Sequence, residues 1–463
     1  MSDRLDAAAD SCAPDIDDWR RLIKKSGRDV AKLRSRSRDG IPIDPLYAAR
    51  TDVQSLAGRA SKRWGIVQII DHADPDAANE QAILDVEGGA TGLSMRFAGG
   101  PSSAGAGLPL TREALGIALN GIDLAGVEVR LEPHAAAPQL ARHLAEWIAR
   151  SGVAPELAAI SPGLDPVAVQ AFRGRDSSVG FSDYVECFGE LKRAGLRGPL
   201  ATLDTRIYHE AGATEAQELA ALLATAAWWL RALDEAGSPP AESMPFFGAG
   251  LAVDHDQFLS IAKLRAAQLM WTRLQELCAI SPSRLSLHAE TSRRMMTRAE
   301  PMTNLLRTTV AAFAASVGGA DSIAVLPHDI ALGAASAGAR ALARSMQHLL
   351  MEESHLHVVS DPAAGSGAVE ALTEELAKRG WDEFRTIERE GGIVESLRSD
   401  AFQIRIAQAR DALSANVASG TVPLVGVTMH RHADEETVSQ TASFRTTAGL
   451  TPITLEELAR AAA

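Results

Sequence analysis

Histidine side chains recur shortly after the apolar runs of this 463-residue sequence, where imidazoles could act as metal ligands or as general acids and bases. The positions are His134, His209, His255, His288 and His328, with Asp361 after the last run. A metal-dependent hydrolase would use such residues to hold a cation that activates water. That class usually carries a paired His-x-His after its first strand, whereas here the first run continues into Phe97-Ala98-Gly99-Gly100. We therefore predict no metal site and keep the metal-dependent barrel hydrolase as an alternative.

Two other groups could take part in chemistry. His209 and Glu210 could form an acid and base pair, although adjacent loop positions seldom point to one place, which favours a structural role. The glycines within residues 361–367 could let the backbone approach a ligand closely, or could form an ordinary strand-to-helix turn.

These residues need a scaffold, and from Trp64 onward short apolar runs alternate with helical stretches, as in βα units of a parallel sheet. Asp74 and Asp165 each precede a proline, and Thr214 with Gln217 forms a capping box, so helices should begin there. Eight strand and helix pairs predict an α/β fold of the (β/α)8 barrel type, with functional residues at the C-terminal ends of the strands. The predicted strands are Gly92–Phe97, Val127–Leu131, Leu157–Ser161, Pro199–Leu203, Phe246–Gly250, Leu285–Ala289, Ser322–Leu326 and His357–Ser360.

Small polar residues occupy predicted strands in which most barrels carry bulky branched side chains. These residues are Ser94, Ser161, Thr202 and Ser286. If they point inward, the barrel has a bore. They could equally face the helices or the strand ends and form local hydrogen bonds.

Composition limits the partners. The 46 Lys and Arg residues against 59 Asp and Glu give a net charge of -13, and no stretch combines basic and aromatic residues, so neither nucleic acid nor an anionic membrane is expected. Three widely spaced cysteines fit a reducing compartment. The N-terminus lacks an apolar leader, and no run reaches the roughly 18 apolar residues of a membrane helix. We predict a soluble, cytoplasmic protein.

The chain divides into four predicted parts. Residues 1–50 form an arm that could wrap a partner or its own barrel, and residues 51–400 form the barrel. Residues 401–430 form a C-terminal helix and linker. Residues 431–463 form a polar tail that is loosely ordered or depends on a partner.

Several segments resemble the methylmalonyl-CoA mutase family of cobalamin-dependent acyl-CoA mutases, and the likeness runs in order from about Trp19 to Val427. The resemblance implies a barrel threaded by the pantetheine of coenzyme A, with Ser94, Ser161, Thr202, Ser286 and His288 near the substrate. It also implies radical chemistry started by adenosylcobalamin, which the protein positions and shields. The segments are Asp39–Tyr47, Glu87–Ser94, His209–Thr214, Asn304–Thr309, Glu352–Ser354, Val359–Ser366 and Leu372–Ala377.

Three departures from the family pattern separate this sequence from catalytic members. The position of the family's histidine over the thioester matches Ile207, and His209 is shifted by two residues, or roughly 6 to 7 Å. The family's glutamine and glycine in His-Cys-Gln-Thr-Ser-Gly correspond to Glu290 and Arg293. The tyrosine that helps cofactor homolysis corresponds to Ile69, which has no hydroxyl. We therefore predict no catalytic residue, with His209 and Glu210 as the remaining candidates.

The cobalamin-binding pattern Asp-x-His-x-x-Gly is not found in this sequence, which ends where that domain normally begins. We therefore expect a non-catalytic small (beta) subunit that pairs with a catalytic large (alpha) subunit, which binds adenosylcobalamin and acyl-CoA. The alternative is an active acyl-CoA mutase barrel that works with a separate cobalamin-binding subunit.

Overall fold

Eight parallel strands form one sheet in the computed structural model, which describes residues 16–53, 55–56, 58–59, 61–103, 106–175, 177–430 and 448–461. Their order around the sheet is β6-β5-β4-β3-β10-β9-β8-β7. The sheet closes where Leu164, just after β6, pairs with Ala201 of β7. The predicted (β/α)8 barrel is therefore confirmed. The strands are β3 (Gly65–Ile70), β4 (Gly92–Met95), β5 (Glu128–Leu131), β6 (Ile160–Ser161), β7 (Ala201–Asp204), β8 (Phe247–Val253), β9 (Ser286–Thr291) and β10 (Ser322–Ala324).

One predicted strand is wrong and one observed strand was not predicted, so the number of strands agrees although one member differs. The first strand is Gly65–Ile70, which the sequence reading passed over, and it lies between β4 and β10. The segment His357–Ser360 is not a strand, and Val358 and Val359 are 60% and 56% exposed. A short apolar run predicts a strand only if a neighbouring strand buries it, and that neighbour is not visible locally.

Helices form the outer layer of the barrel and begin where the sequence predicts them. The Asp74 and Asp165 carboxylates accept backbone N–H groups at the starts of α3 and α6, and Thr214 and Gln217 form the capping box of α9. Helix α9 is buried on most of its surface because α14 packs over it. The helices that follow strands are α3 (Pro75–Glu87), α4 (Arg112–Ala118), α5 (Ala137–Ser151), α6 (Pro166–Arg173), α7 (Phe181–Arg193), α8 (Arg206–Glu210), α9 (Glu215–Glu235), α11 (Gln257–Leu277), α12 (Thr303–Val317), α13 (Ala337–His348) and α14 (Gly367–Arg389).

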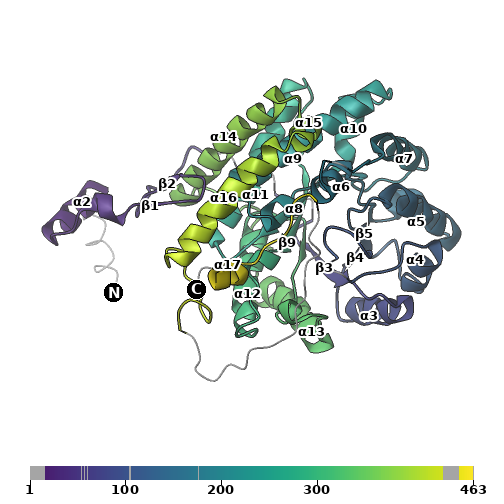
Figure 1. Ribbon diagram of the computed structural model, residues 1–463, viewed down its shortest axis with the longest axis horizontal. Coiled ribbons are helices and arrows are strands. Elements are labelled where there is room, and N and C mark those ends of the chain that lie inside the picture. The colour runs from purple at the N-terminus through teal and green to yellow at the C-terminus, as the bar shows by residue number, and fades with distance from the viewer. Residues whose placement is uncertain are drawn as a thin grey trace, which may run out of the picture.

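The N-terminal arm is anchored at its root and projects at its tip. Helix α2 (Ile16–Lys25) has no buried residue and extends away from the barrel (Figure 1). A two-stranded hairpin, β1 (Ser35–Arg36) and β2 (Pro42–Ile43), joins the arm to the barrel. Between these strands, the Arg38 guanidinium donates to the carbonyls of Gly212 and Ala213 at 2.6 and 3.1 Å.

Residues 448–461 of the predicted polar tail pack against the barrel instead of lying loose, while residues 431–447 are outside the described residues. The Leu450 N–H donates to the Ala171 carbonyl, and the Ile453 N–H donates to the Glu210 carbonyl, both at 2.8 Å. Helix α17 (Leu455–Ala461) buries Leu455 against α16 (Ala401–Ala418). We name residues 448–461 the C-terminal strap.

None of the helices in the described ranges combines the length and the apolar character needed to cross a membrane.

The strap should contribute to the stability of the barrel. Leu455 is 4% exposed, so Leu455→Ala should lower the free energy of unfolding by roughly 2–5 kcal/mol in chemical denaturation. Leu277→Ala is the matched control, since Leu277 is 58% exposed and its truncation leaves no cavity. Equal stability losses in the two variants would contradict the observed docking of α17.

Candidate functional site

The interior of the barrel is identified by strand register, because residues paired across parallel strands point to the same side of the sheet. The five polar residues expected near substrate all lie on one side of the sheet. This side is the inside of the barrel, because its charged side chains form ion pairs between strands that are not neighbours in the sheet. Of these five, Ser286 is exposed at the start of β9 and the others are buried. The paired sets are Ser94 with Arg130 and Ser161, Thr202 with Gly248 and Ser286, and His288 with Ser322, Gly250 and Asp204.

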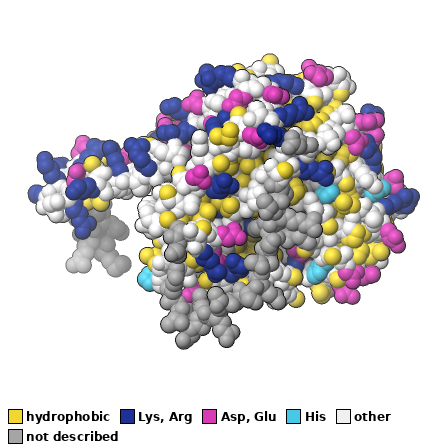
Figure 2. Space-filling view, viewed as in Figure 1, with side chains coloured by type: hydrophobic (Ala, Val, Ile, Leu, Met, Phe, Trp, Pro, Cys, Tyr) yellow, Lys and Arg dark blue, Asp and Glu magenta, His cyan; other side chains and the backbone are white. Residues whose placement is uncertain are grey.

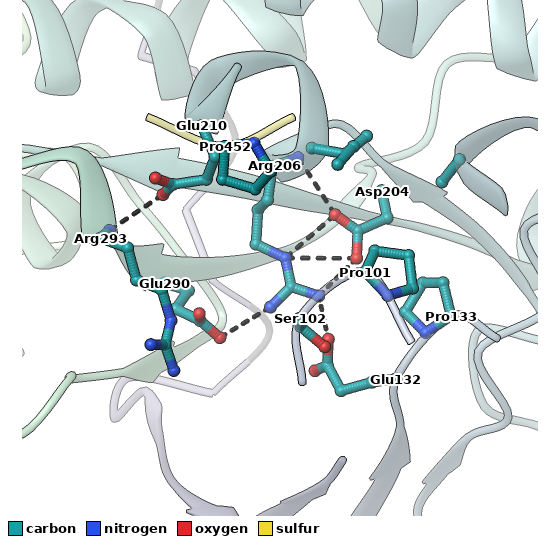
Figure 3. Close-up of a pocket in the computed structure, with 12 residues that line it drawn as sticks. Pro101, Ser102, Glu132, Pro133, Asp204, Arg206, Glu210, Glu290, Arg293 and Pro452 are labelled. Carbon is teal, nitrogen blue, oxygen red and sulfur yellow. Dashed lines mark hydrogen bonds and ion pairs between the residues drawn. The ribbon is translucent and has the colours of Figure 1, made fainter. Parts of the chain in front are cut away.

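Arg206, directly after β7, lies at the centre of a buried charge network at the C-terminal mouth of the barrel (Figure 3). Its Nη1 donates to Glu290 at 2.7 Å and its Nη2 donates to Glu132 at 2.5 Å. Its Nε donates to both carboxylate oxygens of Asp204 at 3.0 and 3.2 Å. Burial alone would lower the pKa of Arg206, but the carboxylates of Asp204, Glu132 and Glu290 raise it well above the ordinary value. The guanidinium is therefore permanently charged.

A second buried arginine extends this network across the barrel. The Arg96 Nη2 donates to the other oxygen of Glu290 at 2.7 Å, and Ser94 donates to the other oxygen of Glu132 at 2.5 Å. The contacts run from β4 and β5 to β9, strands that are not neighbours in the sheet. We call Ser94, Arg96, Glu132, Arg206 and Glu290, with Asp204, the ion layer. This layer occupies the axis at the level where a bore would open.

His288 lies in the same interior and is held neutral. Its Nδ1 is 2.8 Å from the Ser322 hydroxyl, and its residue is 2% exposed. Burial, followed by the nearby guanidinium groups of Arg130, Arg206 and Arg96, lowers its pKa well below the ordinary value. A neutral imidazole here fits a structural hydrogen bond better than an acid.

His209 and Glu210 point to different partners, as expected of adjacent residues. The His209 Nε2 is 3.0 Å from the Ser292 hydroxyl, and burial lowers the pKa of this imidazole well below its ordinary range. The Glu210 carboxylate accepts the backbone N–H groups of Arg293 and Arg294 at 2.9 and 2.8 Å. Burial raises the pKa of Glu210 to about 7.

The remaining candidate residues are dispersed. Ile69 and Ile207 are buried, and only Ile207 borders the pocket at the mouth. The His134 Nδ1 accepts the N–H of Ala136 within its own loop. The prediction that Asp361 lies at the mouth is wrong, because it pairs with Arg265 and accepts the N–H of Leu56, in the segment before β3.

A pocket of about 540 Å³ remains above the ion layer. Asp204 and Arg206 line this pocket together with Pro101, Pro133 and Pro452 (Figure 3). Pro452 belongs to the C-terminal strap, so a segment far along the chain helps to close the mouth.

Sequence reasoning missed the charged members of the ion layer, Arg96, Glu132, Asp204 and Arg206. A signal was present for two of them, since Arg96 and Glu132 continue the period of two from Ser94 and Arg130. The periodicity gives the side of the strand, but it does not reveal which side chains meet across the axis.

Fold and site together define a (β/α)8 barrel protein whose polar interior converges on the C-terminal mouth. Residues 200–451 match the family model described as methylmalonyl-CoA mutase. Over 452 residues the chain is 38% identical to the methylmalonyl-CoA mutase small subunit of Streptomyces virginiae, covering 92% of this chain and 72% of that protein. It is 32% identical over 409 residues to the small subunit of Propionibacterium freudenreichii subsp. shermanii, covering 84% and 61% of the two chains.

The match to large subunits is shorter. The large subunit of Streptomyces virginiae is 34% identical over 236 residues, covering 50% of this chain and 32% of that protein. The chain belongs to the methylmalonyl-CoA mutase family, which confirms the family predicted from the sequence.

Removing the central guanidinium should destabilise the barrel strongly. Arg206→Met leaves three buried carboxylates without their shared cation, and we expect a loss of roughly 3–5 kcal/mol in the free energy of unfolding. Arg231→Met is the control, since Arg231 pairs with Glu388 at the surface and its loss should cost at most about 1 kcal/mol. Similar losses in both variants, measured by urea denaturation, would argue against a central role for Arg206.

The ion layer should also make stability depend on acid pH. Burial favours the neutral form of Glu132, but the guanidinium groups of Arg206 and Arg96 outweigh burial and lower its pKa from 4.5 to about 2. Ionised Glu132 therefore stabilises the fold above about pH 4.5, and this contribution is lost as the pH falls towards 2. Glu132→Gln should flatten the dependence of unfolding free energy on pH in this window, and the exposed control Glu186→Gln should not. Parallel curves for Glu132→Gln and the unaltered chain would refute this assignment.

Proposed function

We propose that this chain is the small, non-catalytic subunit of a heterodimeric methylmalonyl-CoA mutase, which interconverts (R)-methylmalonyl-CoA and succinyl-CoA in the cytoplasm. The large subunit would bind adenosylcobalamin and acyl-CoA, and this chain would support it. The names of the similar small subunits motivate the proposal, and the ion layer is the observation that carries it.

The carboxylates of the ion layer are already occupied by partners inside the protein. Both carboxylate oxygens of Glu132 and of Glu290 already accept hydrogen bonds. Inserting pantetheine between them would separate buried ion pairs and leave charges uncompensated, which costs several kcal/mol per ion. Ile69 and Ile207 offer no hydroxyl or imidazole at the positions that the family uses for chemistry.

The mouth does not fit a corrin ring in the described arrangement. The C-terminal strap crosses it, with Leu450 and Ile453 hydrogen-bonded to Ala171 and Glu210. A planar macrocycle over the mouth would displace Pro452 from the pocket. We therefore assign the cofactor to the large subunit and derive no step through it in this chain.

The N-terminal arm supplies a surface for the large subunit. Residues 16–38 carry nine Lys or Arg and three Asp, although the whole chain has a net charge of -13. These basic side chains crowd the projecting arm in Figure 2. Leu22 is 64% exposed on α2, so the arm also offers apolar surface. A projecting basic helix with exposed apolar residues suits an acidic, grooved protein partner.

Reversing the charge of α2 should weaken the complex. We expect at least tenfold weaker binding to a co-expressed large mutase chain, measured by surface plasmon resonance, when Arg20, Arg21, Lys24 and Lys25 are changed to Glu. The charges that attract the partner during association, and that contact it in the complex, would then have the opposite sign. The matched control changes Lys378, Arg379, Arg385 and Arg389, which are exposed cations of α14, to Glu. Unchanged affinity in the α2 variant would exclude the arm from the interface.

Mutase activity should require the large chain. The isolated protein with adenosylcobalamin should show no turnover of methylmalonyl-CoA and no binding of acyl-CoA by calorimetry, because the ion layer blocks the axis. Adding the large chain should give activity. Turnover by this chain with cobalamin, or with a separate cobalamin-binding polypeptide alone, would overturn the proposal and favour an active barrel.

A further inference from the structure

A second buried cluster lies beside the mouth, where α8, the start of α9 and the loop after β8 meet. It contains His209, Glu215 and Asp254, and one potential ligand atom from each lies within 4.8 Å of the others. Among the described residues, this is the one group of three or more such side chains with that spacing. None of the three belongs to the ion layer.

One of these ligand groups has a buried oxygen without a hydrogen-bond partner. The Glu215 Oε2 is buried and accepts no hydrogen bond from any described residue, and Glu215 is only 5% exposed. The His209 Nε2 lies 3.9 Å from Asp254 Oδ2 and pairs with the Ser292 hydroxyl, while its Nδ1 lies 3.4 Å from Glu218 Oε2. Native proteins rarely leave a buried carboxylate oxygen without a donor or a cation, since the desolvation is then uncompensated.

The charged neighbours of the cluster are already partly paired. Lys263 pairs with Glu218 at 2.5 Å, and the Arg294 Nη2 lies 3.2 Å from Asp254 Oδ2 and 3.9 Å from Glu215 Oε1. The other Arg294 terminal nitrogen donates to the carbonyls of His209 and Ala213. These contacts leave Glu215 Oε2 as the ligand oxygen without a donor among the described residues.

We propose that His209, Glu215 and Asp254 bind one divalent first-row transition metal ion, Zn²⁺ or Mn²⁺. One imidazole nitrogen with two carboxylate oxygens suits these ions, whereas Mg²⁺ and Ca²⁺ prefer all-oxygen sites. The ion has a structural role, because it ties the corner between α8 and α9 to the loop after β8. Asp39, in the arm hairpin, accepts the N–H of Ala216 at the start of α9, so the same ion steadies the root of the arm.

The test uses the full chain purified in the presence of Zn²⁺ or Mn²⁺ and then dialysed against metal-free buffer. We expect close to one ion per chain by mass spectrometry, and a melting temperature that rises with metal concentration. Glu215→Gln and, independently, Asp254→Asn should lose the ion and the shift. Glu235→Gln, an exposed glutamate at the end of the same helix α9, should retain both.

A spectroscopic measurement separates this site from surface binding. Co²⁺ in place of Zn²⁺ should give visible absorption bands that disappear in Asp254→Asn, while circular dichroism confirms that the variant is folded. If the folded wild-type chain retains neither ion, the proposal is wrong. Equal metal retention by Glu215→Gln, Asp254→Asn and Glu235→Gln would equally overturn it, because the ion would then be adventitious.

Discussion

A guanidinium without access to bulk water must find its counter-charges inside the protein, and this constraint governs the barrel mouth. Arg206 forms ion pairs with Asp204, Glu132 and Glu290, and Glu290 also pairs with Arg96. The contacts join strands that are distant in the sheet, so the layer braces the barrel across its axis. A bore and this network cannot occupy the same space, because every carboxylate withdrawn from Arg206 leaves a buried charge uncompensated.

The packing of helices on the outside of the sheet is separate from the contacts inside the barrel. The outer surface of the barrel is buried by helices such as α9, which α14 covers in turn. The outer packing and the ion layer therefore stabilise the barrel through separate sets of contacts. The C-terminal strap adds a further contact at the mouth, where Pro452 borders the pocket.

Local sequence patterns predicted most of the fold, because caps and periodicity are short-range properties. Asp74, Asp165 and Thr214 begin helices where expected. The patterns failed for β3 and for residues 357–360, because burial by a neighbouring strand decides whether an apolar run is a strand, and that neighbour is far along the chain. The docking of residues 448–461 was missed for the same reason.

The candidate site was predicted only in part, and the missing part is again long-range. Residue type placed small polar groups such as Ser94 on strands, and strand register places them inside the barrel. The hydrogen-bond partner of Ser94 is Glu132, directly after the neighbouring strand β5, which the sequence alone does not reveal. The contacts also separate two clusters that look alike by composition. Both oxygens of Glu132 and of Glu290 accept hydrogen bonds, whereas Glu215 has a buried oxygen with no donor among the described residues. Completeness of hydrogen bonding at the carboxylates, rather than the number of charged residues, therefore distinguishes a structural ion network from a site that still has room for a cation.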